Sequence, residues 1–267
     1  MGLTDPIVHV RQAVLGFIEL LGEFSFFMGE AFGSLRRQGL RWMLFFRHCE
    51  FIGASSLGIV SVAAIFVGGV MGFQLYASLH LFAAESLLGG SIGVSVFREL
   101  GPVMAAVMVT GRAGAAIAAE IATMRITEQV DALEVMGVDP IGYLVTPRVL
   151  AGLLMMPLVA MYFSVVSTLA GAFVSCDVMG LQYSIYWSQF TKVVDRIEII
   201  HCLVKGAFFG LVLTGIACFC GFRTQGGARS VGLATRSSVV AGCLTILLAD
   251  YILTSLLPWG WPVLVAE

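Results

Sequence analysis

The sequence predicts an all-α integral membrane protein with five transmembrane helices, preceded by an amphipathic helix at the membrane surface. Of the 267 residues, 58% are hydrophobic and only 12% are charged, about half the charged fraction of a typical soluble domain. Uncharged runs at 51–84 and 149–176 exceed the roughly 20 helical residues that cross a ~30 Å hydrocarbon layer. This composition excludes an ordinary water-soluble enzyme. The formal net charge of −2 also excludes a nucleic-acid-binding protein that depends on a basic surface.

The first 50 residues form a separate region. Apolar side chains recur there every three or four residues, which is typical of an amphipathic helix: Ile7, Val10, Val14, Phe17, Leu21, Phe24 and Met28. Beside a membrane domain such a helix is expected to lie in the cytoplasmic interface, although packing against protein would give the same pattern. We therefore divide the chain into 1–50, an interfacial helix and basic segment, and 51–267, a five-span membrane domain.

The five expected spans differ in how far charge interrupts them. They are 52–76, 94–119, 148–175, 200–222 and 237–259. Arg98, Glu99 and Arg112 fall within the second span and Asp250 falls within the fifth. The first uncharged run is longer than one upright helix requires, so we expect a bend or re-entrant turn near the glycines at 68–72.

Positive charge sets the expected orientation. Most of the 15 Lys and Arg residues lie in the first 50 residues and in the connections after spans two and four. Because such loops tend to stay in the cytoplasm, we expect a cytoplasmic N-terminus and a C-terminus on the outer side. The first long apolar run begins at residue 51, too late for a cleaved signal peptide.

Cysteine and histidine do not indicate a metal or catalytic site. The six Cys include no Cys-x-x-Cys pair, and within apolar spans Cys commonly serves as a small packing residue. The four His residues are dispersed along the chain. We therefore expect this chain to bind no metal and no cofactor.

Span two carries the most informative pattern. Arg98 and Glu99 lie near its outer end, and charges inside a membrane are usually paired or face a polar cavity. A snorkelling interfacial pair is the structural alternative. Further along, small residues recur at the four-residue spacing that lets helices approach closely in lipid. They predict a tight contact within or between subunits and include Gly111, Gly114, Ala115, Ala118 and Ala119.

A short acidic helix is predicted at 124–138, between spans two and three. Its apolar and acidic residues lie on separate helical faces: Ile126, Val130 and Leu133 on one, and Glu128, Asp131 and Glu134 on the other. Gly137 and Pro140 are expected to end it. The segment is too polar to span a membrane and suits docking on a soluble partner, although a connector lying on the membrane would have the same composition.

The segment 98–148 resembles the MlaE permease family of ABC lipid transporters. The resemblance rests on the blocks RELGP, GRAG, AAEI, TEQVDALE and MGVDP, which match in order and spacing. These blocks are long and therefore more specific than a lone glycine motif. The resemblance extends more weakly over nearly the whole chain, and is weakest in the first 45 residues and the last dozen.

The resemblance implies a five-span permease that works as a homodimer in the inner membrane of Gram-negative bacteria, with its C-terminus in the periplasm. The implied partners are a cytoplasmic P-loop ATPase dimer that uses ATP and Mg, an MCE-domain protein on the periplasmic side, expected as a hexamer, and often a STAS-domain protein. The implied substrate is phospholipid, moved to maintain outer-membrane lipid asymmetry. The segment 124–138 would be the coupling helix, meeting the ATPase through Arg125, Glu128, Asp131 and Glu134.

The resemblance also implies a lipid pocket in a dimer cavity lined by spans one, two and five. A phospholipid site needs a broad apolar surface and a few polar groups for the headgroup, and basic side chains bind phosphate well. The expected pocket residues are Phe73, Gln74, Leu75, Tyr76, Leu79, Phe82, Arg98, Glu99, Leu100 and Lys205.

The chain contains no GxxxxGK[ST] motif, so it is not itself a P-loop ATPase. If transport is driven by ATP, hydrolysis must come from another polypeptide, and this chain is expected to be a non-catalytic subunit. Two other classes stay open. An ion-coupled secondary transporter or channel could use Arg98, Glu99, Glu120 and Asp250 as a relay, but it predicts inverted repeats, which are not visible here. An intramembrane lipid-modifying enzyme would need a nucleophile–base or His/Asp cluster, which the dispersed His residues argue against.

Overall fold

The computed structural model confirms the all-helical, five-span fold. It describes residues 6–257, with the backbone alone for 6–14, 17 and 38. Within the described residues five helical stretches are long and apolar enough to cross a membrane: Trp42–His80, Glu85–Ile126, Ile141–Val178, Arg196–Phe222 and Ala228–Leu256. The predicted end of span five at 258–259 and the outer position of the C-terminus lie outside the described residues.

Spans one and two are interrupted helices, span three is an unbroken helix with a π-turn at each end, and spans four and five are continuous. The α-helices are α1 (Pro6–Gln38), α2 (Trp42–Ile52), α3 (Leu57–His80), α4 (Leu88–Ser95), α5 (Gly101–Val109), α6 (Ala115–Ile126), α7 (Gln129–Val135), α8 (Thr146–Phe173), α9 (Tyr183–Val193), α10 (Arg196–Phe222) and α11 (Ala228–Leu256). The turns between them are the 3-10 turns η1 (Ala54–Ser56) and η2 (Glu85–Leu87), and the π-turns η3 (Val96–Leu100), η4 (Thr110–Gly114), η5 (Ile141–Val145) and η6 (Val174–Val178). Such turns depart from the α-helical hydrogen-bond ladder and often mark functional sites.

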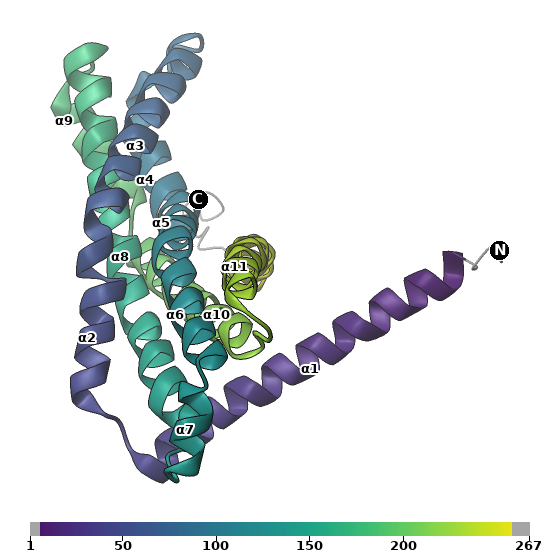
Figure 1. The fold of residues 1–267 in the computed structure, drawn as a ribbon. Coiled ribbons are helices and arrows are strands. Elements are labelled where there is room, and N and C mark those ends of the chain that lie inside the picture. The colour runs from purple at the N-terminus through teal and green to yellow at the C-terminus, as the bar shows by residue number, and fades with distance from the viewer. Residues whose placement is uncertain (1–5, 258–267) are drawn as a thin grey trace.

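Helix α10 forms the centre of the bundle. It packs against α5, α6, α8 and α11, while α3 packs along α8. The most apolar segment of α10 is 72% buried, whereas that of α11 is 11% buried, so α11 lies at the periphery. In Figure 1, α3, α4 and α9 reach one end of the bundle and α7 lies at the other. We call these the α9 end and the α7 end.

Helices α8 and α10 meet backbone to backbone through glycine. A Cβ built on Gly210 would lie 2.1 Å from the carbonyl oxygen of Gly152, and one on Gly206 would lie 2.9 Å from the Cα of Pro157. Gly206 and Gly210 are four residues apart, the spacing that allows transmembrane helices to approach closely. The centre of the bundle therefore depends on the absence of side chains at these positions.

The expected bend near residues 68–72 is wrong. Helix α3 runs unbroken through this region, and span one is interrupted earlier, at η1. A Cβ on Gly68 would lie 2.0 Å from the carbonyl oxygen of Ser167, and one on Gly72 would lie 2.8 Å from that of Gly171. These glycines serve close contact with α8 rather than bending.

The predicted amphipathic helix is present as α1, which leads away from the α7 end of the bundle (Figure 1). Its later part is packed: Phe24 and Phe27 contact Phe219 edge-on, and the Ser34 and Thr146 hydroxyls are 2.7 Å apart. Its earlier part exposes Leu15, Ile18 and Leu21, and Phe26 points away from the packed side. The side chains of Ile7, Val10, Val14 and Phe17 lie outside the described set. Packing against this protein therefore covers only part of the apolar face.

The α3–α8 contact predicts a sharp difference between two glycines of α3. Gly68→Ala should destabilise the protein by about 1–3 kcal/mol, the usual cost of overpacking, because the new Cβ would meet the α8 backbone. Gly58→Ala should be neutral or slightly stabilising, because nothing lies within 4 Å of a Cβ there and Ala is the better helix former. Thermal unfolding of both variants in detergent measures the difference. Equal melting temperatures would contradict this packing.

Candidate functional site

The charges of span two are carried by its two π-turns. Arg98 and Glu99 lie in η3, and Arg112 lies in η4. Arg112 donates to the Ser56 hydroxyl at 3.0 Å and to the carbonyl oxygen of Phe51, and its guanidinium lies over the Phe51 ring. It therefore binds the groups at the break in span one. In both turns the helix departs from regular geometry where it carries a charge.

Arg98 forms a two-pronged ion pair with Glu198 of α10. Its Nε donates to Oε2 at 3.0 Å and its Nη2 donates to Oε1 at 2.8 Å. The side chains are 13% and 6% exposed, so this pair lies inside the bundle rather than snorkelling at its surface. Parallel hydrogen bonds between guanidinium and carboxylate are among the strongest that side chains make.

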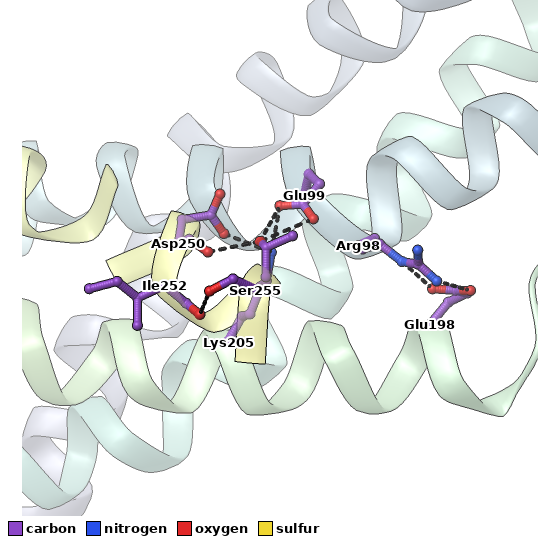
Figure 2. A network of polar contacts seen from close by, with 8 residues as sticks. Arg98, Glu99, Glu198, Lys205, Asp250, Ile252 and Ser255 are labelled. Atoms are coloured by element: carbon purple, nitrogen blue, oxygen red, sulfur yellow. Dashed lines mark hydrogen bonds and ion pairs between the residues drawn. The ribbon is translucent and has the colours of Figure 1, made fainter. Parts of the chain in front are cut away.

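Glu99 belongs to a separate cluster around Lys205. The ammonium of Lys205, which is fully buried, donates to Glu99 at 2.5 Å and to the Thr254 hydroxyl at 2.8 Å. It also forms an ion pair with Asp250 at 2.8 Å. Figure 2 shows both groups of charges along α10, with Arg98 and Glu198 on one side and the Lys205 cluster on the other. One lysine thus joins η3, α10 and α11.

This geometry corrects the interpretation of Arg98 and Glu99 as each other's partners. Adjacent residues of a helix point in different directions, and here each reaches a different charge on α10. The relay suggested for an ion-coupled transporter is only partly assembled, because Glu99 and Asp250 share Lys205 whereas Glu120 pairs with Arg148.

The predicted pocket residues fall into four groups. Phe73 and Gln74 line an open apolar cavity of about 960 Å³ on the surface between α3 and α8, together with Gly69 and exposed side chains such as Phe66 and Phe173. Others pack against a small core at the α9 end: Leu75, Tyr76, Leu79 and Leu100. Phe82 is exposed, and Arg98, Glu99 and Lys205 belong to the ion pairs described above. Within one chain these residues do not line a single pocket.

Lys205 is not accessible to a ligand in this structure, because it is fully buried and surrounded by its protein partners. Glu99, with a side chain 35% exposed, is the most accessible charged member of the cluster. A direct contact between phosphate and Lys205 would therefore require the cluster to open.

The predicted coupling helix at 124–138 is divided in two. Helix α6 ends at Ile126, Glu128 adopts a left-handed conformation with φ of 59°, and α7 follows. Arg125 pairs with Asp131 across this break. Glu128 and Glu134 are exposed while Val130 is buried, so α7 presents an acidic outer surface.

The end of α7 agrees with the expected stop at Gly137. Gly137 has a φ of +73°. Its amide donates to the carbonyl of Glu134, and the amide of Val138 donates to that of Leu133. This is the hydrogen-bond pattern of a glycine-terminated helix.

The small residues of span two face in different directions. Gly114 is buried, whereas Gly111 is exposed and nothing lies within 4 Å of a Cβ built there. Ala115 is partly buried. The face that contains Gly111 and Ala115 is thus open in the single chain.

Sequence reasoning missed Glu198, Thr254 and the glycines that bring α3, α8 and α10 together. The Gly-x-x-x-Gly spacings at 68–72 and 206–210 could have revealed the glycine contacts. No local pattern marks Glu198 or Thr254, because their partners lie about 100 and 155 positions away in the chain.

Together these features define a polytopic helical membrane protein whose buried charges are paired across the bundle. A family model described as Permease MlaE matches residues 45–256. The chain is 39% identical over 247 residues to a probable ABC transporter permease protein of Rickettsia felis, covering 92% of this chain and 95% of that one. It is 34% identical over 256 residues to the intermembrane phospholipid transport system permease protein MlaE of Haemophilus influenzae, covering 96% and 98%.

A plant relative extends the comparison. The chloroplastic protein TRIGALACTOSYLDIACYLGLYCEROL 1 of Arabidopsis thaliana is 34% identical over 216 residues, covering 81% of this chain and 62% of that one.

The family model and the full-length similarity to MlaE show that this chain belongs to the MlaE permease family, as its sequence blocks predicted. It is the non-catalytic, membrane-spanning component of an ABC transporter, and this class implies an ATPase partner.

The Lys205 cluster predicts a strong effect of removing its cation. Lys205→Met would leave Glu99 and Asp250 without a cation between them and should cost about 3 kcal/mol, the lower end for a broken buried pair because Glu99 is 35% exposed. Lys192→Met is the matched control, since the chain's other lysine is exposed on α9. Thermal unfolding measures both effects.

Neutralising the carboxylates provides the second arm of this test. Combining Lys205→Met with Glu99→Gln and Asp250→Asn should recover most of the lost stability, because no charge is then left unpaired. If Lys205→Met alone unfolds at the wild-type temperature, the cluster does not hold α11 in place.

Proposed function

We propose that this chain is the permease subunit of an ATP-driven transporter that moves phospholipids between the inner membrane and the periplasmic side, and so maintains outer-membrane lipid asymmetry. The observation that carries this proposal is its similarity, over nearly its full length, to a permease named for intermembrane phospholipid transport. The chain itself supplies an apolar cavity and buried, paired charges, which suit an amphipathic substrate better than a soluble one.

The cavity between α3 and α8 is the proposed site for acyl chains. It is open on one side, with exposed walls such as Phe66 and Phe173, which suits an acyl chain entering from the lipid. Gln74 supplies a polar group, while the glycine at position 69 leaves space beside α8. The ion pairs of Arg98 and Lys205 would position the helices around the headgroup rather than bind it in this state.

The proposed assembly follows the family resemblance. A second copy of this chain would pack against the open face at Gly111 and Ala115, and a P-loop ATPase dimer using ATP and Mg would bind at α7. An MCE-domain hexamer would meet the α9 end, and a STAS-domain protein would join on the ATPase side. In this assembly the α7 end would face the cytoplasm and the α9 end the periplasm. Native mass spectrometry should find two copies of this chain in the complex, and a single copy would contradict the homodimer.

Filling the cavity tests the proposed function. Gly69→Leu should reduce ATP-dependent transfer of labelled phospholipid between reconstituted vesicles by about tenfold or more, a barrier increase of at least ~1.4 kcal/mol, because its side chain would occupy the cavity. Gly58→Leu, an open glycine position on the same helix outside the cavity, should transfer lipid normally. Normal transfer by Gly69→Leu would place the lipid path elsewhere. The absence of any ATP-dependent transfer by the wild-type complex would contradict the proposed function itself.

The acidic surface of α7 predicts where the ATPase binds. Glu128→Lys combined with Glu134→Lys should reduce co-purification of the ATPase, because two exposed acidic side chains would become basic at the proposed contact. Asp131 is left unchanged because it pairs with Arg125. Glu19→Lys with Glu30→Lys makes the same charge change at exposed positions of α1 and should have no effect. A wild-type yield of ATPase with the α7 variant would contradict this binding site.

A further inference from the structure

Arg148 is a buried arginine that belongs to neither the Arg98–Glu198 pair nor the Lys205 cluster. It lies in the first turn of α8, and its side chain is 3% exposed. Its Nη1 donates to the carbonyl oxygen of Leu144 at 2.6 Å, and its Nη2 pairs with Glu120 at 2.9 Å. A buried guanidinium is costly unless its bonds are made, so its placement requires an account.

The two partners of Arg148 lie on either side of α7 in the chain. Glu120 belongs to α6, which leads into the α7 segment, and Leu144 belongs to η5, which leads out of it. Helices α6 and α8 both pack against α10. The Arg148–Glu120 ion pair adds a direct link between them, so one side chain holds both ends of the segment that carries α7.

Arg148 is also incompletely bonded. Its Nε is buried and has no hydrogen-bond partner among the described residues. Such groups are rare in native structures, because a buried donor without a partner loses its hydration without compensation. His48 of α2 and Cys218 of α10 lie within electrostatic range of both Arg148 and Glu120. Residues of α2, α6, α8 and α10 therefore meet at this point.

We propose that Arg148 is the positioning residue through which movement of α7 reaches the membrane helices. Displacing α7 would pull on Glu120 and on the Leu144 carbonyl together, and both pulls meet at the guanidinium on α8. The backbone contacts of α8 with α3 and α10 at Gly68 and Gly210 would carry the shift into the bundle. The free Nε is then the donor that gains a partner in the second state. This inference rests on the proposed coupling of α7 to an ATPase.

The test uses Glu120, because its side chain is 55% exposed and can be changed without emptying a core position. Glu120→Gln in the full reconstituted complex should leave assembly and ATP hydrolysis near wild type. Lipid transferred per ATP hydrolysed should fall about 2- to 30-fold, the range typical of residues that modulate coupling. Glu120→Asp, which keeps the charge, should recover much of the ratio.

Glu23→Gln is the matched control. It breaks another ion pair with an arginine, that of Glu23 and Arg223 at 2.7 Å between α1 and the end of α10, and should not change the ratio. An unchanged ratio in Glu120→Gln would overturn the inference while leaving the proposed function intact. A parallel loss of assembly, hydrolysis and transport would also overturn it, since that pattern indicates a purely structural role.

Spin labels give a readout that does not depend on transport. With labels on Met136, which is 67% exposed, and on Leu158 of α8, which is 55% exposed, the wild-type distance should change when the ATPase binds nucleotide. In Arg148→Lys and Glu120→Gln this change should shrink. A full wild-type change in both variants would show that movement reaches α8 by another route.

Discussion

The structure depends on one constraint: within a membrane, each charged group must find its counter-charge or polar partner inside the protein. Unpaired charge in hydrocarbon is expensive, and here Arg98, Lys205 and Arg148 each reach a carboxylate on another helix. These long-range pairs fix which helices are neighbours. Arg112 follows the same rule with a hydroxyl and a carbonyl at the interruption of span one.

Interrupted helices allow these pairs to form. The π-turns η3 and η4 carry the charges of span two, and η5 supplies the carbonyl that Arg148 binds. Continuous helices have the complementary role: α10 is largely buried and packs on α8 through glycines, so it offers a rigid surface on which the pairs are organised. Helix α11 is mostly exposed, packs against α10 and α6 on one side, and adds polar contacts from Asp250 and Thr254 to Lys205. The molecule therefore combines a closely packed centre with a peripheral helix that both packing and ion pairing join to it.

The sequence predicts the fold well because hydropathy and length are local properties. All five spans, the amphipathic α1 and the glycine that ends α7 follow from short windows. The charge partners do not, because Arg98 and Glu198 are 100 residues apart and no pattern within either segment encodes the other. The glycines at 68–72 show a further limit: the same residues permit a bend or a close contact, and only the position of α8 decides between them. The predicted pocket residues were chosen by chemical type and resemblance, and one chain distributes them among a cavity, a small core, two ion-pair groups and an exposed position, Phe82.

The most direct test of this account is a double-mutant cycle on Arg98 and Glu198, with Arg98→Gln, Glu198→Gln and the double variant compared by reversible unfolding. Residues in direct contact typically couple by about 0.5–3 kcal/mol, and for this buried two-pronged pair the account predicts a coupling above about 1 kcal/mol. The corresponding cycle on Arg98 and Glu99 should give a much smaller value, because their side chains bind different partners. A coupling near zero for Arg98 and Glu198 would contradict the claim that charges paired across the bundle organise this protein.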